Sequence, residues 1–352
     1  GIVSGSLGGV STVSNVDYEN VTGATAIIGA TYDGGKAVEA KIGDTYYATL
    51  QTAIDAAKAG DNTIQLLADI TDDVAILQQE GKNIVIDGKK NDTEKYTFNG
   101  TINIYGDARH TGEETLTIQN VNFYTEDNAR YFIEANEIGQ IPGTNNFKQY
   151  AHNVTVENCN FATSAGNTNN TVVGMRFRQA YNMSAVNCTS DGIFSIMWTT
   201  AVEGLTLNKV VATNCKEGIT IGGASKKVNI TGTTINSETY AIRAEGAGSE
   251  FTIKNSTLEA KVPVVVREVT DNSKISFTFN GTNTITESNP TSYWFVAGAG
   301  DIAYQGNENE QLPETAGQVS VTLNDTGLRY EDVYGNYYEL AGEGTANNPY
   351  TI

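Results

Sequence analysis

The sequence predicts an all-β chain wound as a right-handed, single-stranded parallel β-helix, a solenoid with an N-terminal amphipathic capping helix. Three segments that begin at Leu205, Val228 and Phe251 can be overlaid, because their starts lie 23 residues apart. Each alternates apolar with polar residues, which is the period of a strand with one buried face. A repeat of roughly 20–25 residues with two or three short strands is typical of a solenoid. Each repeat is therefore expected to form one coil.

A second short apolar run lies 13 residues after the start of each segment, and the first-strand pattern recurs on both sides. The second runs begin at Gly218, Ala241 and Val264. Further first strands begin at Ile64, Ile84, Leu116, Val154, Met183 and Ile275. Unequal steps fit a solenoid, since each coil contacts only its neighbours and tolerates inserted loops. We expect roughly ten coils, about 45–50 Å long at about 4.8 Å per coil.

The overlay also predicts columns of equivalent residues along the solenoid. Asn at the fifth position suits a corner with left-handed backbone, and stacked amides can bond along the column. These residues are Asn120, Asn158, Asn187 and Asn255. The eighth position is expected to be interior, and it is occupied by Phe123, Phe161, Ala212, Ile235 and Leu258, with Ser190 as the exception. Cys159 and Cys188 share the sixth position; we favour a ladder of buried thiols, with a disulfide as the alternative.

A short amphipathic helix is predicted just before the first coil, near residues 49–59. Its apolar residues recur at i, i+3, i+4 and i+7, and they are Leu50, Ala53, Ile54 and Ala57. Thr49 can cap its start and Gly60 can end it. Such a helix can cover the open end of a β-helix and protect its strand edges from pairing with other chains.

The chain divides into three parts in this interpretation. Residues 1–40 form an N-terminal arm or linker. Residues 41–305 form the β-helix with its capping helix, and residues 306–352 form strands that cover the far end.

The stretch around the predicted helix resembles a known superfamily. Residues 49–57 (TLQTAIDAA) and 60–66 (GDNTIQL) are similar to the opening of pectin-lyase-like, right-handed parallel β-helix proteins. The lead-in from Lys41 to Asp73 also resembles modules in surface proteins of gut bacteria. The superfamily includes polysaccharide lyases, glycoside hydrolases, phage tailspikes and noncatalytic adhesins. The resemblance therefore implies a fold but not one activity.

Composition excludes several kinds of partner. The formal charge of −19 and the pI near 4.4 argue against nucleic acid, since phosphate binding needs a basic stripe. No run of about 18 apolar residues is present to span a membrane. Three Cys and two His do not have the spacing of a zinc site, so we expect neither a metal nor a cofactor. We expect a monomer at the cell surface or outside the cell.

The motifs of pectin-degrading enzymes are absent from the sequence. A polygalacturonase-type hydrolase needs clustered Asp residues, but the only adjacent pair, Asp72-Asp73, falls in the first coil. The Arg-x-Pro-x-x-Arg motif of pectate lyases is also missing. His110 and His152 lie in loop-like contexts, where solvated or capping histidines are the ordinary case. The catalytic residues, if the chain is an enzyme, remain unknown.

Outward-facing arginines on the second strands are the candidate ligand site. Alternation in residues 175–178 (MRFR) points Arg176 and Arg178 outward, and Arg243 alternates in the same way. Planar arginine forks suit carboxylates or sulfates, and Phe194 can stack a sugar ring. The candidate ligand-binding residues are Arg176, Arg178, Phe194, Arg243, Arg267, Glu245 and Glu268. The alternative, which is the commoner arrangement of exposed arginines, is local pairing with Glu217, Glu245 and Glu268 on a solvated face.

Glu245 and Glu268 are also 23 residues apart, so a strict register stacks them about 4.8 Å apart. That distance is close to the roughly 5–5.5 Å between the carboxylates of a retaining glycosidase. Two functions follow. The favoured one is a noncatalytic adhesin that binds a polysaccharide or a host cell-surface glycan. The alternative is a lyase or hydrolase acting on an acidic polysaccharide.

Overall fold

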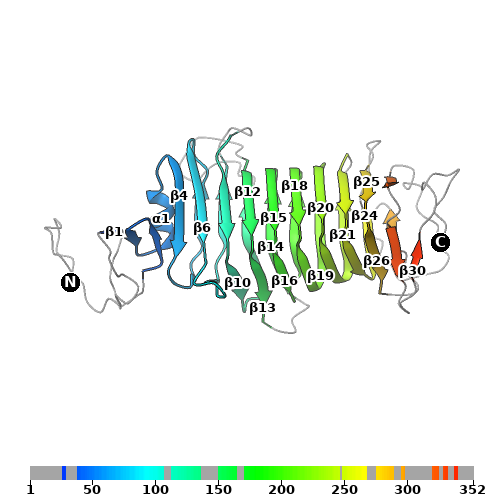
Figure 1. Cartoon of the computed structure of the whole chain (residues 1–352), viewed down its shortest axis with the longest axis horizontal. Helices are drawn as coiled ribbons and strands as arrows, with labels where there is room; N and C mark the ends of the chain where they lie inside the picture. Colours follow the sequence, from blue (N-terminus) through cyan, green and yellow to red (C-terminus); the bar gives the residue numbers. More distant parts are fainter. Residues whose placement is uncertain are drawn as a thin grey trace.

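The computed structural model describes residues 26–28, 38–106, 112–135, 150–164, 170–245, 248–267, 275–288, 295–297, 319–324, 328–331 and 337–339. Short strands dominate these segments, and they stack along one long axis (Figure 1).

The first sheet contains ten described strands that run parallel, each one coil from the next. They are β4 (Gly60–Leu66), β6 (Lys82–Asp87), β9 (Leu116–Gln119), β12 (His152–Glu157), β15 (Tyr181–Val186), β18 (Glu203–Asn208), β20 (Lys226–Thr231), β22 (Glu250–Lys254), β25 (Ile275–Asn280) and β28 (Val319–Asn324). This number agrees with the roughly ten coils expected from the repeat.

The second sheet has two strand positions per coil. The first position is occupied by β7 (Thr97–Phe98), β10 (Asn122–Thr125), β13 (Asn160–Thr163), β16 (Thr189–Asp191), β23 (Thr257–Ala260), β26 (Asn283–Glu287) and β29 (Leu328–Glu331), and β30 (Tyr337–Glu339) pairs antiparallel with β29. The second position is occupied by β5 (Val74–Leu77), β8 (Ile102–Tyr105), β11 (Ala129–Ala135), β14 (Thr171–Arg178), β17 (Ser195–Thr200), β24 (Val262–Arg267) and β27 (Phe295–Ala297). The long strands β19 (Val211–Gly222) and β21 (Thr234–Glu245) span both positions. The chain thus passes through the first sheet and both positions of the second before it returns, which is the path of a parallel β-helix.

The predicted register holds in the middle of the solenoid and shifts by two residues toward its ends. Leu205 pairs with Val228, as the 23-residue repeat predicts. Further along, Phe251 in β22 pairs with Phe277 and not with the predicted Ile275. Near the start, Ile64 in β4 pairs with Ile86 in β6 and not with the predicted Ile84. The interior pattern survives both shifts, because a two-residue shift keeps every side chain on the same face.

A one-residue error affects the second strands. Val264 pairs with Ile242, whereas the overlay placed it beside Ala241. The run of valines in β24 does not alternate, so the sequence did not determine which valines face inward.

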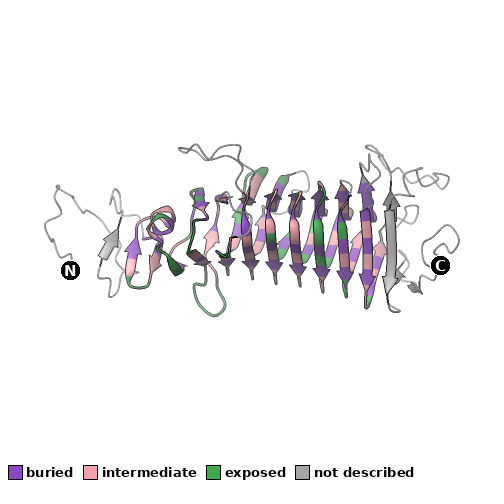
Figure 2. Cartoon of the chain, turned by 90° about the horizontal axis from the view of Figure 1, so that it is seen from above, coloured by how far each residue is buried: buried purple, intermediate pink, exposed green. Residues whose placement is uncertain are grey.

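The predicted columns are confirmed. The fifth-position asparagines have positive φ values of 50° to 57°, and Asn158 Nδ2 donates to Asn120 Oδ1 at 2.6 Å. The eighth position is buried in every coil named above, and Ser190 is buried beside the Cys215 thiol at 3.4 Å. In Figure 2, buried and partly exposed residues alternate along the strands, with the core inside the coil.

The three cysteines are free and buried, which confirms the thiol ladder at Cys159 and Cys188. Burial raises the pKa of the Cys159 thiol well above its usual value, and it raises the pKa of Cys215 to about 11.

The predicted helix is α1 (Leu50–Ala56), and its start is confirmed. The Thr49 side chain accepts a hydrogen bond from Thr52 N, and Leu50, Ala53 and Ile54 are buried. The predicted end at Gly60 is wrong, because Ala57 is the C-cap and Gly60 already begins β4.

The N-terminal edges of the two sheets are covered by different elements. The first sheet ends in antiparallel pairing, since β2 (Ala40–Ile42) lies between β4 and β3 (Thr45–Tyr47), with β1 (Ala26–Ile28) beyond. The second sheet is covered by the helix: Gln51 Nε2 donates to Ala75 O at 3.0 Å, and Ala75 N donates to Gln51 Oε1 at 2.8 Å. The Gln51 side chain therefore makes the two hydrogen bonds to the β5 backbone that a further strand would make. The helical pattern had placed this residue on the polar side of the helix.

The division into arm, β-helix and C-terminal cover stays a prediction. Within the last part, β28 pairs parallel with β25 over six residue pairs, from Ile275 with Val319 to Asn280 with Asn324.

Candidate functional site

A row of polar and aromatic residues runs across the outer side of the second sheet. Strand pairing aligns five of them one coil apart, and we call them the arginine row: Glu134, Arg176, Trp198, Thr220 and Arg243. Arg176 and Arg243 are three coils apart, as predicted. At about 4.8 Å per coil the whole row is about 19 Å long.

Arg176 is held by groups on neighbouring coils. Its Nη1 lies 2.8 Å from Glu134 Oε1. Its guanidinium carbon lies 4.2 Å from the centroid of the Tyr131 ring and 5.9 Å from that of Trp198. Only 17% of the Arg176 side chain and 13% of the Glu134 side chain are exposed. The guanidinium is thus fixed by a charge-assisted hydrogen bond and by two aromatic rings.

Three aromatic rings gather around this arginine. The Trp198 ring centroid is 6.5 Å from that of Tyr131 and 6.3 Å from that of Phe194, and both pairs are tilted. All three side chains are half-buried. We call these residues the aromatic cluster. Phe194 is thus near the arginines, as expected, but Trp198 occupies the central place in the row.

Arg243 pairs with two carboxylates. Its Nη1 lies 3.4 Å from Glu217 Oε1, and its Nη2 contacts Glu245 Oε1. Thr220 Oγ1 donates to Glu217 Oε2 at 2.9 Å, and Thr220 is buried. The side chains of Arg243, Glu217 and Glu245 are only 12% to 20% exposed. This end of the row is therefore a closed network of one cation and two anions.

Of the remaining candidate residues, Arg178 is the one whose side chain the structure describes. Arg178 is exposed, and no ion pair involves it within the described part of the chain. Glu245 pairs in register with Arg267, so the predicted stacking of Glu245 on Glu268 is wrong. The cause is the one-residue shift in β24. Glu268 and the side chain of Arg267 lie outside the described residues.

Two residues of the site were missed from the sequence. Glu134 lies in β11 between inward-facing Ile133 and Ala135. That apolar–polar–apolar alternation was the available signal. Tyr131 had no such signal, because Phe132 and Ile133 are both buried and the alternation breaks beside it.

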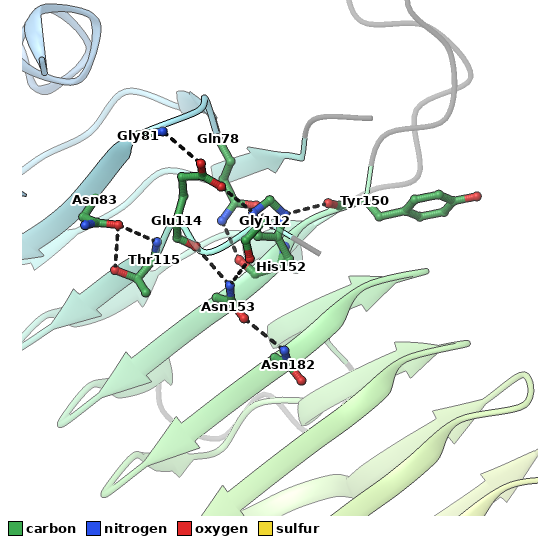
Figure 3. Close-up of polar contacts among 10 residues, drawn as sticks. All are labelled: Gln78, Gly81, Asn83, Gly112, Glu114, Thr115, Tyr150, His152, Asn153 and Asn182. Carbon is green, nitrogen blue, oxygen red and sulfur yellow. Dashed lines mark hydrogen bonds and ion pairs between the residues drawn. The ribbon is translucent and has the colours of Figure 1, made fainter. Parts of the chain in front are cut away.

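His152 is buried, so the expectation of a solvated or capping histidine is wrong. It begins β12 and is 1% exposed, and its Nε2 lies 3.5 Å from Glu114 Oε2 (Figure 3). Its backbone N donates to Gln78 Oε1 at 2.9 Å, and Gln78 Nε2 donates to its carbonyl at 2.5 Å. Gly112 lies so close that a Cβ there would fall 2.4 Å from His152 Nε2. His110 lies outside the described residues.

This buried cluster joins distant parts of the chain. Glu114 Oε1 also accepts a hydrogen bond from Gly81 N at 2.9 Å, and Asn153 Nδ2 donates to Gly112 O at 2.7 Å (Figure 3). Gln78, Gly81, the 112–115 segment and the start of β12 are thereby tied together. We interpret the cluster as structural, and the candidate ligand site remains the arginine row.

Among the described residues, no three His, Cys, Asp or Glu side chains gather to hold a metal ion. No helix in those residues is long and apolar enough to cross a membrane.

Comparison with known proteins gives one similarity. No protein-family model matches the chain, and no curated protein matches it. Among solved structures, a double mutant of the periplasmic alginate epimerase AlgG is similar, with 12% identity and a TM-score of 0.28 over 77% of this chain and 82% of that one.

Proposed function

We propose that the protein is a noncatalytic β-helix that binds a polysaccharide along the outer side of its second sheet. The observation that carries the proposal is the aromatic cluster around Arg176. Ring faces pack against the apolar faces of sugars, while a few fixed polar groups orient the ligand. Tyr131, Trp198 and Phe194 supply the rings, and Glu134 and Arg176 supply the polar groups.

The shape of the site suits an extended ligand. The arginine row follows the solenoid axis, and the stretch from Arg176 to Arg243 covers three coil steps. At about 4.8 Å per coil that stretch is roughly 15 Å long, enough to contact about three sugar units. The backbone beneath it is a rigid parallel sheet, so the polar groups are held in place before binding.

The handedness of the coil and the location of the protein are also part of this proposal. We expect the coil to be right-handed, because crossovers between parallel strands of one sheet are right-handed in about 98% of cases. We expect the protein outside the cell or on its surface, where an adhesin or glycan-binding β-helix meets polysaccharides.

The alternative function is a lyase or hydrolase, and one observation favours it. Glu134, Glu217 and Glu245 are three carboxylates on one face, each at most 20% exposed. General acid and base groups are commonly partly buried carboxylates.

The test combines binding with depolymerisation. The parent protein is screened on a polysaccharide array, and each bound polymer is then assayed for new reducing ends and unsaturated products. We expect binding without cleavage, and loss of binding in Trp198→Ala. Tyr124→Ala is the matched control, because Tyr124 is an exposed aromatic residue at the other strand position. Product release would replace the noncatalytic function by the enzymatic one, and no binding to any polymer would reject both.

A further inference from the structure

We infer that the ligand of the arginine row is an uncharged polysaccharide. This inference rests on the proposed function and names the class of ligand. It departs from the expectation drawn from the sequence, in which free arginines capture the carboxylates or sulfates of an acidic glycan.

The first reason is that two of the arginines, Arg176 and Arg243, already have their anions. Arg176 pairs with Glu134 at 2.8 Å, and Arg243 pairs with both Glu217 and Glu245. These ion-paired residues are two arginines and three glutamates, so their formal charge is 2 − 3 = −1. A carboxylate that approached either paired guanidinium would also approach a fixed carboxylate, and like charges at that distance repel.

The second reason is the whole-molecule charge. The chain carries a formal net charge of −19. A polyanion is therefore repelled before contact, while an uncharged polymer is not.

The third reason is the kind of hydrogen bond on offer. A sugar hydroxyl both donates and accepts, whereas a carboxylate or sulfate only accepts. A carboxylate acceptor lies beside a guanidinium donor at each end of the row, Glu134 beside Arg176 and Glu217 beside Arg243. Such paired acceptors and donors match hydroxyl groups, and the rings of the aromatic cluster match the apolar faces of neutral sugars.

The experiment uses pairs of polymers that share a backbone and differ in charged substituents. Three pairs of similar chain length are measured on the full chain: hydroxyethylcellulose against carboxymethylcellulose, dextran against dextran sulfate, and methyl-esterified against de-esterified polygalacturonate. We expect the uncharged member of the bound pair to bind at least about tenfold more tightly. Its Kd should change less than about twofold between roughly 0.05 and 0.5 M NaCl, because no net charge is screened.

Glu134→Gln gives a second, independent readout. Gln keeps the shape and an acceptor oxygen but removes the anion, which leaves Arg176 free to meet a carboxylate. Because Glu134 is itself proposed to contact the ligand, the readout is the ratio of the two dissociation constants: we expect it to shift at least about threefold toward the charged member, whatever the change in affinity for the neutral one. Far-UV circular dichroism confirms that the variant is folded.

Two outcomes separate this inference from the proposed function. If the charged member binds more tightly and its affinity falls steeply with salt, the inference is wrong while polysaccharide binding stands. If neither member of any pair binds, and the wider array is also negative, the proposed function fails and the inference fails with it.

Discussion

Replacing Arg176 by Ala should destabilise the protein, although Arg176 lies on the outer side of the sheet. The alternation pattern alone predicts almost no change, since exposed substitutions usually stay within about 0.5 kcal/mol. In the structure, however, Arg176 and Glu134 form a 2.8 Å ion pair with only 17% and 13% of their side chains exposed.

The magnitude follows from these contacts. A hydrogen bond between charged groups contributes about 1.5–3 kcal/mol, and the Tyr131 ring at 4.2 Å adds about 0.5–1 kcal/mol. Incomplete burial lowers the first contribution, so we expect Arg176→Ala to cost about 2 kcal/mol of unfolding free energy. A double-mutant cycle with Glu134→Ala should give a coupling energy of about 1–1.5 kcal/mol.

Urea unfolding followed by circular dichroism measures these changes, provided that the slopes of the transitions agree between variants. The matched control is Arg178→Ala, two residues along the same strand, where the side chain is exposed and we expect less than about 0.5 kcal/mol. Equal, small effects of both arginine substitutions, with no coupling to Glu134, would show that the row is only a solvated surface.

Three further predictions test the fold. Gln51→Leu removes both hydrogen bonds to Ala75, so amide exchange along β5 should accelerate and stability should fall by about 0.5–1.5 kcal/mol, because water can replace the lost partner; unchanged exchange at Ala75 would contradict the capping role. Gln78→Leu leaves the buried N–H and C=O of His152 without partners and should cost about 2–3 kcal/mol in urea unfolding, whereas an unaltered midpoint would mean that water replaces the amide. The pKa of Cys215 is raised from 9.0 to about 11, so folding favours its protonated form. The resulting stability is present below about pH 9 and is lost as pH rises toward about 11. Cys215→Ala should flatten this fall in melting temperature, and an identical pH profile would contradict the assignment.

The sequence by itself determined the coil and its corners. A period of two residues identifies an inward face wherever Ile, Val, Leu or Phe alternates with polar residues, and this information is local. The left-handed corners were also local, because Asn at positions such as Asn120 and Asn158 tolerates positive φ. Burial of Phe123 beside Phe161, with ring centroids 4.9 Å apart, then followed from the repeat.

The tertiary structure decided which coils align and which charges meet. A two-residue shift preserves the alternation, so the pattern could not distinguish Phe277 from Ile275 as the partner of Phe251. The Arg176–Glu134 pair joins residues 42 positions apart across a long insertion. Its existence depends on register, which only the stacked coils determine. The sequence also offered local pairing of the arginines with nearby glutamates, and this is confirmed for Arg243 with Glu217 and Glu245. Glu134 as the partner of Arg176 came only from the tertiary structure.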